Sequence, residues 1–439
     1  MRMRRREFVT LTGGTALAAC APKTAATATT TPAASVDGWA AVRAEFDQDP
    51  DYSNMTGFLM MPNPRPVREA IAARRAELDR NPALVIERQF DLARSEQDSH
   101  EERARKAAAA FIAVPPGEVA LTDSTTMGLG LVYNGLRLAA GKEVVVDNHS
   151  HYSTFEALRL RARRDGVGVR NVDLYAQPAT VSVDEVVSRL RSALRPETRL
   201  VALTWVHSST GVKMPVRAIA DALAEVNGDR DEADRVLLSV DGVHGFGVED
   251  ATMPELGCDV FIAGCHKWIC GPRGTGIVWA RPEVWSQVVA TIPAFEGPNF
   301  AAWMNGRQPE GPGGLMNTPG GFHSFENRWS LASAFEFQVG IGRAAIQDRI
   351  HALNTRLKQG LVELPAVRLH TPRDPALSCG INCFEVEGHA PGAIVEALLK
   401  ERIVASTSPY RVSYARLAPS LLNDERQVDE AVKAVAALR

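Results

Sequence analysis

The sequence predicts an α/β protein built around a mostly parallel β-sheet. Four short runs are rich in β-branched residues and apolar along their whole length: Val144–Val146, Leu200–Thr204, Val236–Val240 and Val260–Ala263. Strands covered on both faces of a sheet have this composition. Helical patterns lie before and between these runs: Thr126–Ala139, Thr154–Arg164, Val183–Leu194 and Val216–Val226. Such alternation is typical of parallel strands joined by helical crossovers.

Two further helices are expected on the N-terminal side of this region. An amphipathic pattern starts near Val67, directly after Pro64 and Pro66, and a second runs from about Asn81 to Phe111. Proline is well tolerated in the first turn of a helix, so the two prolines mark a helix start.

The C-terminal side predicts a smaller α+β domain. The glycine- and proline-rich stretch 292–321 predicts a long irregular segment, and such segments are often functional. A long helix over Ala332–Leu353 then leads into shorter strands and helices, the last of which starts near Asn423.

Composition excludes several classes of protein. The 439 residues carry 49 Lys and Arg against 52 Asp and Glu, and the net charge of −3 predicts no basic field for nucleic acid or an anionic membrane. Six cysteines in so long a chain are too few for a scaffold built on disulfides.

The first residues differ from the rest and predict an export signal. Arg4, Arg5 and Arg6 precede a weakly apolar stretch from Phe8 to Ala19, which matches the twin-arginine pattern and is too short to span a membrane. The alternative is a disordered basic tail. We therefore expect a periplasmic protein, because the twin-arginine route carries folded proteins across the membrane.

A lipid anchor is a second expectation for this end. Residues 17–20 read Leu-Ala-Ala-Cys and resemble a bacterial lipobox, in which Cys20 would be lipidated after cleavage. A plain cleavage site is the alternative. Residues 21–34, rich in Ala, Thr and Pro, resemble a solvated tether. No other segment is apolar enough to span a membrane.

Familiar nucleotide and metal motifs are absent. The chain contains no P-loop and no HExxH, and Gly128-Leu129-Gly130 lacks the third glycine of a dinucleotide fingerprint. The cluster Cys258, Cys265, His266 and Cys270 has no Cys-x2-Cys pair, so we expect no metal. Another cysteine pair, 379 and 383, is spaced for about 13 Å along a strand, which is too far for a disulfide.

Two residues at strand ends carry the chemistry. Asp241 follows the strand at 236–240, and Lys267 comes shortly after the strand at 260–263, before a glycine-rich loop. Because ligands bind at the carboxyl ends of parallel strands, an acid and a lysine there can converge on one ligand. The alternative is a turn aspartate and a surface lysine, but a lysine between so apolar a strand and a glycine loop would be unusual on a surface.

These segments, "DGVHGFG" and "GCHKWICGPRGTG", resemble the class V family of pyridoxal-phosphate enzymes of fold type I. The family includes aminotransferases, cysteine desulfurases and isopenicillin N epimerase, and the resemblance spans roughly residues 50–439. It implies a large domain with a mostly parallel seven-stranded sheet and a small C-terminal domain. It also implies that Lys267 forms the Schiff base with the cofactor, that Asp241 pairs with the pyridine nitrogen, and that His244 supports the ring oxygen or Asp241.

The resemblance further implies a phosphate site. Ser124, Thr125 and Thr126 precede a helix where the family places its phosphate-binding turn, and amides at a helix N-terminus suit a dianion. An ordinary helix cap has the same sequence. His266 is the family's other phosphate ligand. Gly264 departs from the pattern, since relatives have a hydroxyl residue there.

Residues of a second subunit are expected to complete the phosphate site. "SFENRW" lies where many relatives make a contact across a homodimer, and Arg328 is the candidate phosphate ligand within it.

The ring and the substrate need their own contacts. The resemblance implies that His151, with His149 as the alternative, stacks on the cofactor, and that Ser208 touches the ring oxygen. Arg411, in "YRVSYA", falls at the family's "RxS" arginine and would grip the substrate carboxylate bidentately. The alternatives are that these histidines are solvated loop residues and that Arg411 is a surface arginine.

The resulting division of the chain has five segments. They are a signal and linker (1–34), an N-terminal arm (35–65), a large cofactor-binding domain (66–295), an active-site and dimer loop (296–330) and a small C-terminal domain (331–439).

The expected activity is α-proton removal from an amino acid or peptidic amine, with transamination as the preferred outcome. Epimerisation and C–S lyase chemistry are the alternatives. Cysteine desulfuration is disfavoured, because Ile403–Tyr410 contains no cysteine. A binding protein that has lost its catalytic activity is disfavoured, because Lys267 and Asp241 are both present.

Overall fold

The computed structural model describes residues 36–90 and 99–438. The predicted export signal, Cys20 and the tether lie outside these residues. Contacts group residues 34–439 into one compact unit. Among the helices of the described residues, none has the length and apolarity needed to cross a membrane.

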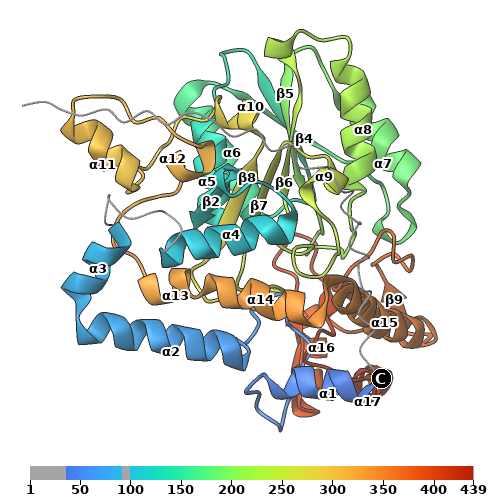
Figure 1. Ribbon diagram of the computed structural model, residues 1–439. Helices are drawn as coiled ribbons and strands as arrows, with labels where there is room; N and C mark the ends of the chain where they lie inside the picture. Colours follow the sequence, from blue (N-terminus) through green and yellow to red (C-terminus); the bar gives the residue numbers. More distant parts are fainter. Residues whose placement is uncertain (1–35, 91–98, 439) are drawn as a thin grey trace, which may run out of the picture. The chain divides into compact units, whose positions relative to one another are not determined.

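A seven-stranded sheet forms the centre of this unit (Figure 1). Its strands, in spatial order, are β2 (Val119–Thr122), β8 (Gly276–Ala280), β7 (Val260–Gly264), β6 (Leu237–Asp241), β5 (Thr198–Thr204), β3 (Glu143–Asp147) and β4 (Gly168–Val172). Strand β8 runs antiparallel to both neighbours, and the other pairs are parallel. The predicted fold class is thereby confirmed.

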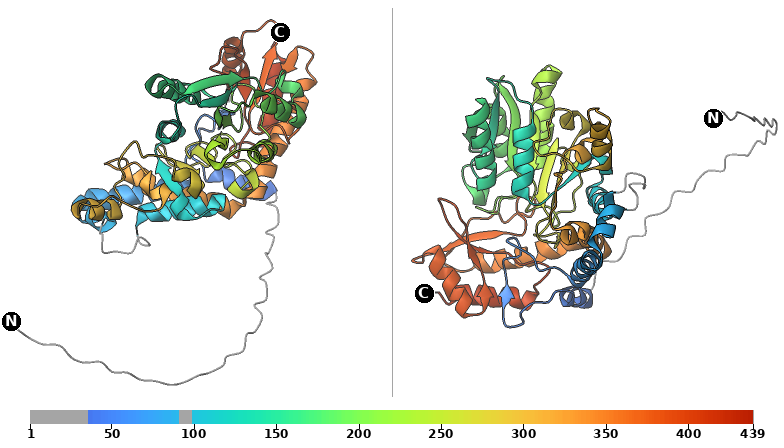
Figure 2. Two further views of the ribbon diagram at one scale, coloured as in Figure 1. Left: turned by 90° about the horizontal axis from the view of Figure 1, so that it is seen from above. Right: turned by 90° about the vertical axis from the view of Figure 1, so that its left-hand side faces the viewer.

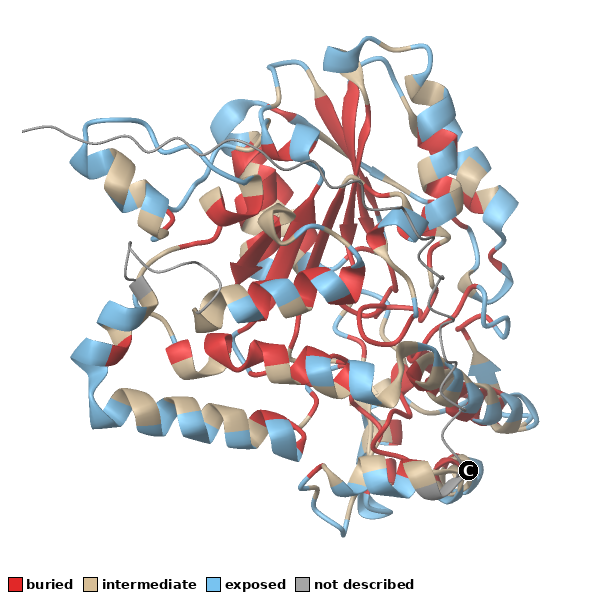
Figure 3. Cartoon of the chain, viewed as in Figure 1, coloured by how far each residue is buried: buried red, intermediate tan, exposed pale blue. Residues whose placement is uncertain are grey.

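Every residue of the strands from β2 to β3 in this order is buried, and only the edge strand β4 is partly exposed (Figure 3). Alternate residues of each strand face opposite sides, so the sheet needs apolar cover on both. Val145 belongs to one apolar cluster, while Val144 and Val146 belong to another. This double cover explains why the strands read as continuous apolar runs.

Two groups of helices supply the cover (Figure 2). The side chains that join the cluster of Val144 come from α5 (Thr125–Gly135), α6 (Tyr152–Asp165) and α10 (Pro282–Trp285). Those that join the cluster of Val145 come from α4 (His100–Ile112), α7 (Val183–Ala193), α8 (Val216–Asn227), α9 (Met253–Leu256) and α14 (Leu331–Ile341).

The C-terminal residues form a second, smaller sheet with its own apolar cluster. Its antiparallel order is β12 (Ser406–Thr407), β13 (Ala415–Leu417), β10 (Asn382–Val386) and β9 (Val367–Leu369). Helices α15 (Arg343–Val362), α16 (Pro391–Lys400) and α17 (Glu425–Ala436) contribute to that cluster. This is the expected α+β arrangement.

The N-terminal arm joins this C-terminal part. Strand β1 (Ser53–Asn54) pairs in parallel with β11 (Ile403–Val404). The arm also contains α1 (Val36–Ala44) and leads into α2 (Arg65–Arg80), whose start after Pro64 agrees with the predicted helix near Val67.

Two long helices and one loop differ from the prediction. The helix expected over 81–111 is two helices, since α3 (Pro82–Phe90) ends before Ser99 caps α4. The helix expected over 332–353 is interrupted by Gly342, whose φ of 101° separates α14 from α15. The stretch 292–321, which was expected to be irregular, contains two short helices, α11 (Gly297–Met304) and α12 (Gly313–Met316), and α13 (Phe325–Trp329) follows it.

The described cysteines are free and buried, including Cys379 and Cys383, as their spacing predicted.

Candidate active site

Asp241 and Lys267 meet at one edge of the large sheet. Asp241 is the last residue of β6, and Lys267 follows the end of the neighbouring parallel strand β7 by three residues. Lys267 Nζ lies 3.3 Å from Nε2 of His244, which belongs to the turn after β6. The predicted convergence of the acid, the lysine and His244 is therefore present in the structure.

Burial shifts the pKa of both charged groups toward neutrality. It raises the pKa of Asp241 to about 6, against the effect of the Val243 amide, which donates to Oδ1 at 3.2 Å, and of Lys267. Burial lowers the pKa of Lys267 to about 8, with Asp241 opposing this and Arg416 adding to it. An amine with this pKa offers a free lone pair near physiological pH, as a Schiff-base lysine requires.

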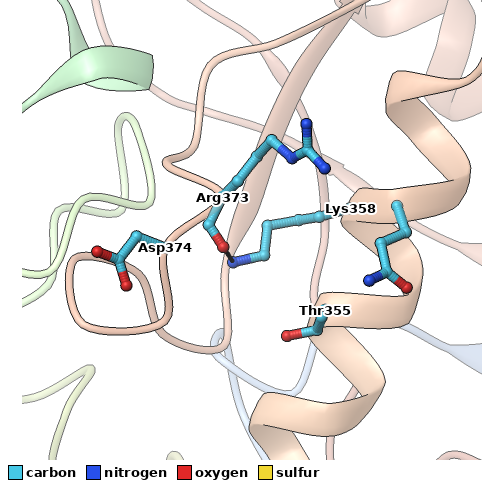
Figure 4. Close-up of a pocket in the computed structure, with 5 residues that line it drawn as sticks. Thr355, Lys358, Arg373 and Asp374 are labelled. Atoms are coloured by element: carbon cyan, nitrogen blue, oxygen red, sulfur yellow. Dashed lines mark hydrogen bonds between the residues drawn. The ribbon is translucent and has the colours of Figure 1, made fainter.

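A second buried lysine, Lys358 of α15, shows what a structural lysine looks like in this chain (Figure 4). Burial also lowers its pKa to about 8. Its Nζ, however, donates to the carbonyls of Pro372 and Arg373, each at 3.1 Å, and to Ser378 Oγ at 2.6 Å. An ammonium has three N–H donors, and all three are used here. Three acceptors thus surround the amine of Lys358, whereas His244 is the one hydrogen-bond partner of the Lys267 amine among the described residues.

The phosphate residues form a cradle at the start of α5. Ser124 caps the helix, since its Oγ accepts from the Met127 amide at 3.1 Å, and within the described part of the chain the amides of Thr125 and Thr126 have no hydrogen-bond acceptor. Thr125 Oγ1 accepts from the Gly264 amide at 2.8 Å, which leaves the threonine hydrogen free to donate. A helix N-terminus with open amides and a hydroxyl donor suits a dianion.

Gly264 is explained by the same cradle. A Cβ at this position would lie 3.0 Å from the His266 ring and 3.1 Å from Thr125 Oγ1, so a side chain there would crowd both proposed phosphate ligands. Burial and the charge of Lys267 lower the pKa of His266 to about 4, so its neutral ring would donate or accept a hydrogen bond rather than add charge.

The two candidate stacking histidines have different surroundings. His149 already stacks on Tyr175, with ring centroids 4.4 Å apart and planes 8° apart. His151 is exposed and caps α6, and partial burial and the charges of Lys267 and Arg416 lower its pKa, so it lies near the site. The structure therefore favours His151 as the ring that would cover the cofactor.

The site fits the cofactor implied by the resemblance. Asp241 could pair with the pyridine nitrogen of a cofactor held by Lys267, and the donors at the start of α5 could hold its phosphate. His244 Nδ1 is buried without a hydrogen-bond partner among the described residues, and burial holds the pKa of its ring well below 6.5. A neutral ring with a spare nitrogen can serve a bound polar group.

Arg416 enters the site, and the sequence analysis missed it. It lies in the buried strand β13, and its charge acts on Lys267, His244 and His151. Its guanidinium stacks 4.5 Å above the Phe58 ring. A signal was available, because an arginine between apolar residues of a short strand is rarely buried without a ligand or partner.

Three oxygen atoms fix Arg416. Its Nε donates to Ser406 Oγ at 3.2 Å, its NH1 to the Ser208 carbonyl at 2.9 Å and its NH2 to the Thr407 carbonyl at 2.7 Å. A guanidinium has five N–H groups, so two remain for a ligand.

Arg411, the predicted carboxylate ligand, is exposed in the loop between β12 and β13. Its neighbour Tyr410 turns inward instead and bonds Ser208 Oγ at 2.7 Å. The "RxS" pattern therefore marks the right loop, but the structure brings Arg416 rather than Arg411 to Lys267.

Arg328 is buried and paired within its own chain. Its NH2 donates to Asp123 Oδ1 at 2.8 Å, and its NH1 lies 3.5 Å from Glu101. Asp123 directly precedes Ser124, so the ion pair between Arg328 and Asp123 stabilises the turn that forms the phosphate cradle. Its predicted role across a dimer stays a prediction.

Comparisons with known proteins agree with this geometry. The family model Aminotransferase class-V matches residues 65–413. The chain is 27% identical to isopenicillin N epimerase of Amycolatopsis lactamdurans over 365 residues, which cover 79% of this chain and 84% of that protein. It is 25% identical to isopenicillin N epimerase of Streptomyces clavuligerus over 417 residues, which cover 92% of this chain and 99% of that protein.

A solved structure has the same fold. It is a C-DES mutant with glycine covalently linked to its PLP cofactor, and it aligns with a TM-score of 0.79 and 22% identity over 90% of this chain and 99% of its own.

Proposed function

Because the chain belongs to the class-V aminotransferase family, whose model matches most of its length, we propose that it removes the α-proton of an amino acid or peptidic amine. Its cofactor is pyridoxal 5′-phosphate, the cofactor of this family. When bound, that cofactor supplies an electron sink that stabilises negative charge at the α-carbon.

The chain's own residues bind the cofactor and move the proton. Lys267 would hold the cofactor at its aldehyde group, and its free amine would act as the base for the α-proton. Asp241 would keep the ring nitrogen protonated, and a charged partner of this kind would offset the cost of burying the carboxylate. The observation that carries the proposal is the pairing of Asp241 with a buried Lys267 whose pKa is lowered to about 8.

Arg416 is our candidate for the substrate carboxylate. Two of its N–H groups have no partner among the described residues, and a planar fork of donors matches a carboxylate better than a lysine would. A substrate with a free α-carboxylate follows from this assignment.

Transamination is the outcome we propose first. Lys267 is the amine that would hold the cofactor, and transamination can be carried out by one base that moves the proton between two carbons. Epimerisation is the second candidate, and the two isopenicillin N epimerases that cover 79% and 92% of this chain favour it. Desulfuration stays disfavoured, because Ile403–Tyr410 contains no cysteine.

One experiment tests the cofactor and the base. Purified protein incubated with pyridoxal phosphate should absorb visible light as a lysine-bound cofactor does, and Lys267→Ala should abolish this absorbance. Lys400→Ala, which changes an exposed lysine, is the control. A wild-type protein that takes up no cofactor contradicts the proposal.

A second measurement identifies the outcome. A panel of amino acids and peptidic amines is incubated with the enzyme in deuterated water. We expect deuterium at the α-carbon together with a carbonyl product. Inverted stereochemistry without a carbonyl product identifies an epimerase, and sulfide release from cysteine identifies a desulfurase.

We further propose export to the periplasm by the twin-arginine route. This rests on the arginines at positions 4–6 and on the apolar stretch that follows them.

A further inference from the structure

Tyr410 makes a contact between two distant parts of the chain. Its hydroxyl lies 2.7 Å from Ser208 Oγ, in the loop after β5. Tyr410 itself belongs to the loop between β12 and β13 of the small sheet, 202 positions later. The hydrogen bond therefore joins the C-terminal sheet to the edge of the large sheet that carries Asp241 and Lys267.

The loop that presents Tyr410 is closed at its base. Ser408 donates its amide to the Tyr414 carbonyl at 2.9 Å and accepts from the Tyr414 amide with its Oγ at 2.9 Å. Ser413 Oγ donates to the Ser408 carbonyl at 2.7 Å. At the tip of the loop, Val412 is 60% exposed while Tyr410 is half-buried and turned inward. The base of the loop thus fixes the direction of the phenol.

The pair lies close to two charged groups of the site. The charges of Arg416 and Asp241 both act on Tyr410, whose pKa is raised by burial, and Arg416 NH1 donates to the Ser208 carbonyl at 2.9 Å. Ser208 follows the end of β5 by four residues, and the last residue of β5 pairs with Asp241 at the end of β6. The oxygen substituent of the cofactor ring is next to the ring carbon that carries the aldehyde, so a hydroxyl at this strand edge, near Lys267, could donate to that oxygen.

The direction of the hydrogen bond follows from acidity. A phenol is more acidic than an aliphatic hydroxyl, so Tyr410 donates and Ser208 accepts. The hydrogen of Ser208 then remains free to donate elsewhere. A hydroxyl that already accepts a hydrogen bond is a better donor, because bonds in a chain polarise one another.

We propose that Tyr410 is a positioning residue that orients and polarises the Ser208 hydroxyl toward the ring oxygen of pyridoxal phosphate. This rests on the proposed function, since it requires the cofactor. Through the pair, the placement of the C-terminal loop sets the protonation of the lysine-bound cofactor before any substrate arrives.

This relay of hydrogen bonds, from Tyr410 through Ser208 to the ring oxygen, predicts the direction in which the titration midpoint of the bound cofactor shifts when it is broken. A donor to the ring oxygen competes with the hydrogen bond between this oxygen and the protonated nitrogen of Lys267. Losing the donor strengthens the internal bond, so the lysine-bound cofactor should hold its proton to higher pH. A neutral hydrogen bond of ordinary strength corresponds to a shift on the order of half a pH unit.

The test is a pH titration of the visible absorbance of the cofactor-loaded protein without substrate. Tyr410→Phe removes one oxygen and should raise the titration midpoint by about half a pH unit. Ser208→Ala should raise it at least as far, and the double variant should match Ser208→Ala. Ser208→Thr keeps the hydroxyl and should restore the wild-type midpoint. Val412→Ala, in the same loop, is the control, and thermal unfolding of each variant checks its fold.

The outcomes separate this proposal from the function on which it rests. A wild-type protein without visible absorbance overturns the proposed function. If wild type absorbs, an unchanged or lowered midpoint in Tyr410→Phe overturns the relay, and so do shifts that add in full in the double variant. If Tyr410→Phe does not fold, a Ser208→Ala midpoint equal to wild type overturns it as well.

Discussion

At the scale of single residues, Arg416 should control the affinity for substrate. Arg416→Lys keeps the charge but loses the planar fork, so we expect kcat/KM to fall roughly tenfold to a hundredfold, as for the loss of a charged hydrogen bond of about 1.5–3 kcal/mol. Arg411→Lys, at an exposed position, should change it less than about twofold. Steady-state kinetics of both variants with one substrate decide between the two arginines, and a larger effect at Arg411 would reverse our assignment.

The buried Asp241 predicts how the stability of the cofactor-free protein depends on pH. Its pKa is about 6 in the folded protein, above the ordinary 3.8, so the folded state binds the extra proton between these values. The stabilisation is complete below pH 4 and is lost as the pH rises through 6, and its size is on the order of 3 kcal/mol. Urea unfolding of the wild type and of Asp241→Asn at pH 4.5 and 7 measures it. Parallel changes in both proteins would contradict this assignment.

The residues that could be predicted from the sequence are those that directly follow a strand or begin a helix. Asp241, Lys267 and Thr125 are of this kind, because the carboxyl ends of parallel strands meet at one edge. Arg416 and Tyr410 follow no such rule. The apolar neighbours of Arg416 indicate that it is buried, but whether Arg416 and Tyr410 point into the site depends on how β13 pairs with β10 and β12.

At the scale of elements, the turn after β6 requires glycine. A Cβ at Gly242 would lie 2.1 Å from two ring atoms of Phe261 in β7. We expect Gly242→Ala to lower the free energy of unfolding by about 1–3 kcal/mol, because the ring must shift. Gly340→Ala is the matched control. It lies in α14 with no atom within 4 Å of the added carbon and should stabilise the protein by about 0.5–1 kcal/mol. Denaturant unfolding compares the two, and equal effects would contradict the packing argument.

Element types were predictable where the periodicity was strong, and element ends were not. The four apolar runs are strands, yet β2, β4 and β8 were not predicted, because each is only four or five residues long and such short segments carry little periodicity. The break between α14 and α15 depends on the positive φ of Gly342. Glycine can adopt this conformation, but its presence in a sequence does not show that it does.

At the scale of the whole molecule, export should depend on the arginines before the apolar stretch. Arg5→Lys combined with Arg6→Lys should retain the protein in the cytoplasm, because the twin-arginine route requires the pair. Cell fractionation of wild type and variant measures this, and a double variant that still reaches the periplasm would contradict the assignment.

Cys20→Ala tests the anchor, since a soluble product from both wild type and variant means that no lipid is attached.

The bond between Arg416 and Ser208 spans 208 positions, and it has a consequence for synthesis on the ribosome. The nascent chain presents the cradle, Asp241 and Lys267 well before it presents β13. Side chains from the C-terminal part, among them Cys383, Ala418 and Leu421, also belong to the apolar cluster of Val145 under the large sheet. The core beneath Asp241 and Lys267 therefore gains its full cover only after the last strands have been made, so we expect the site to become rigid late in synthesis.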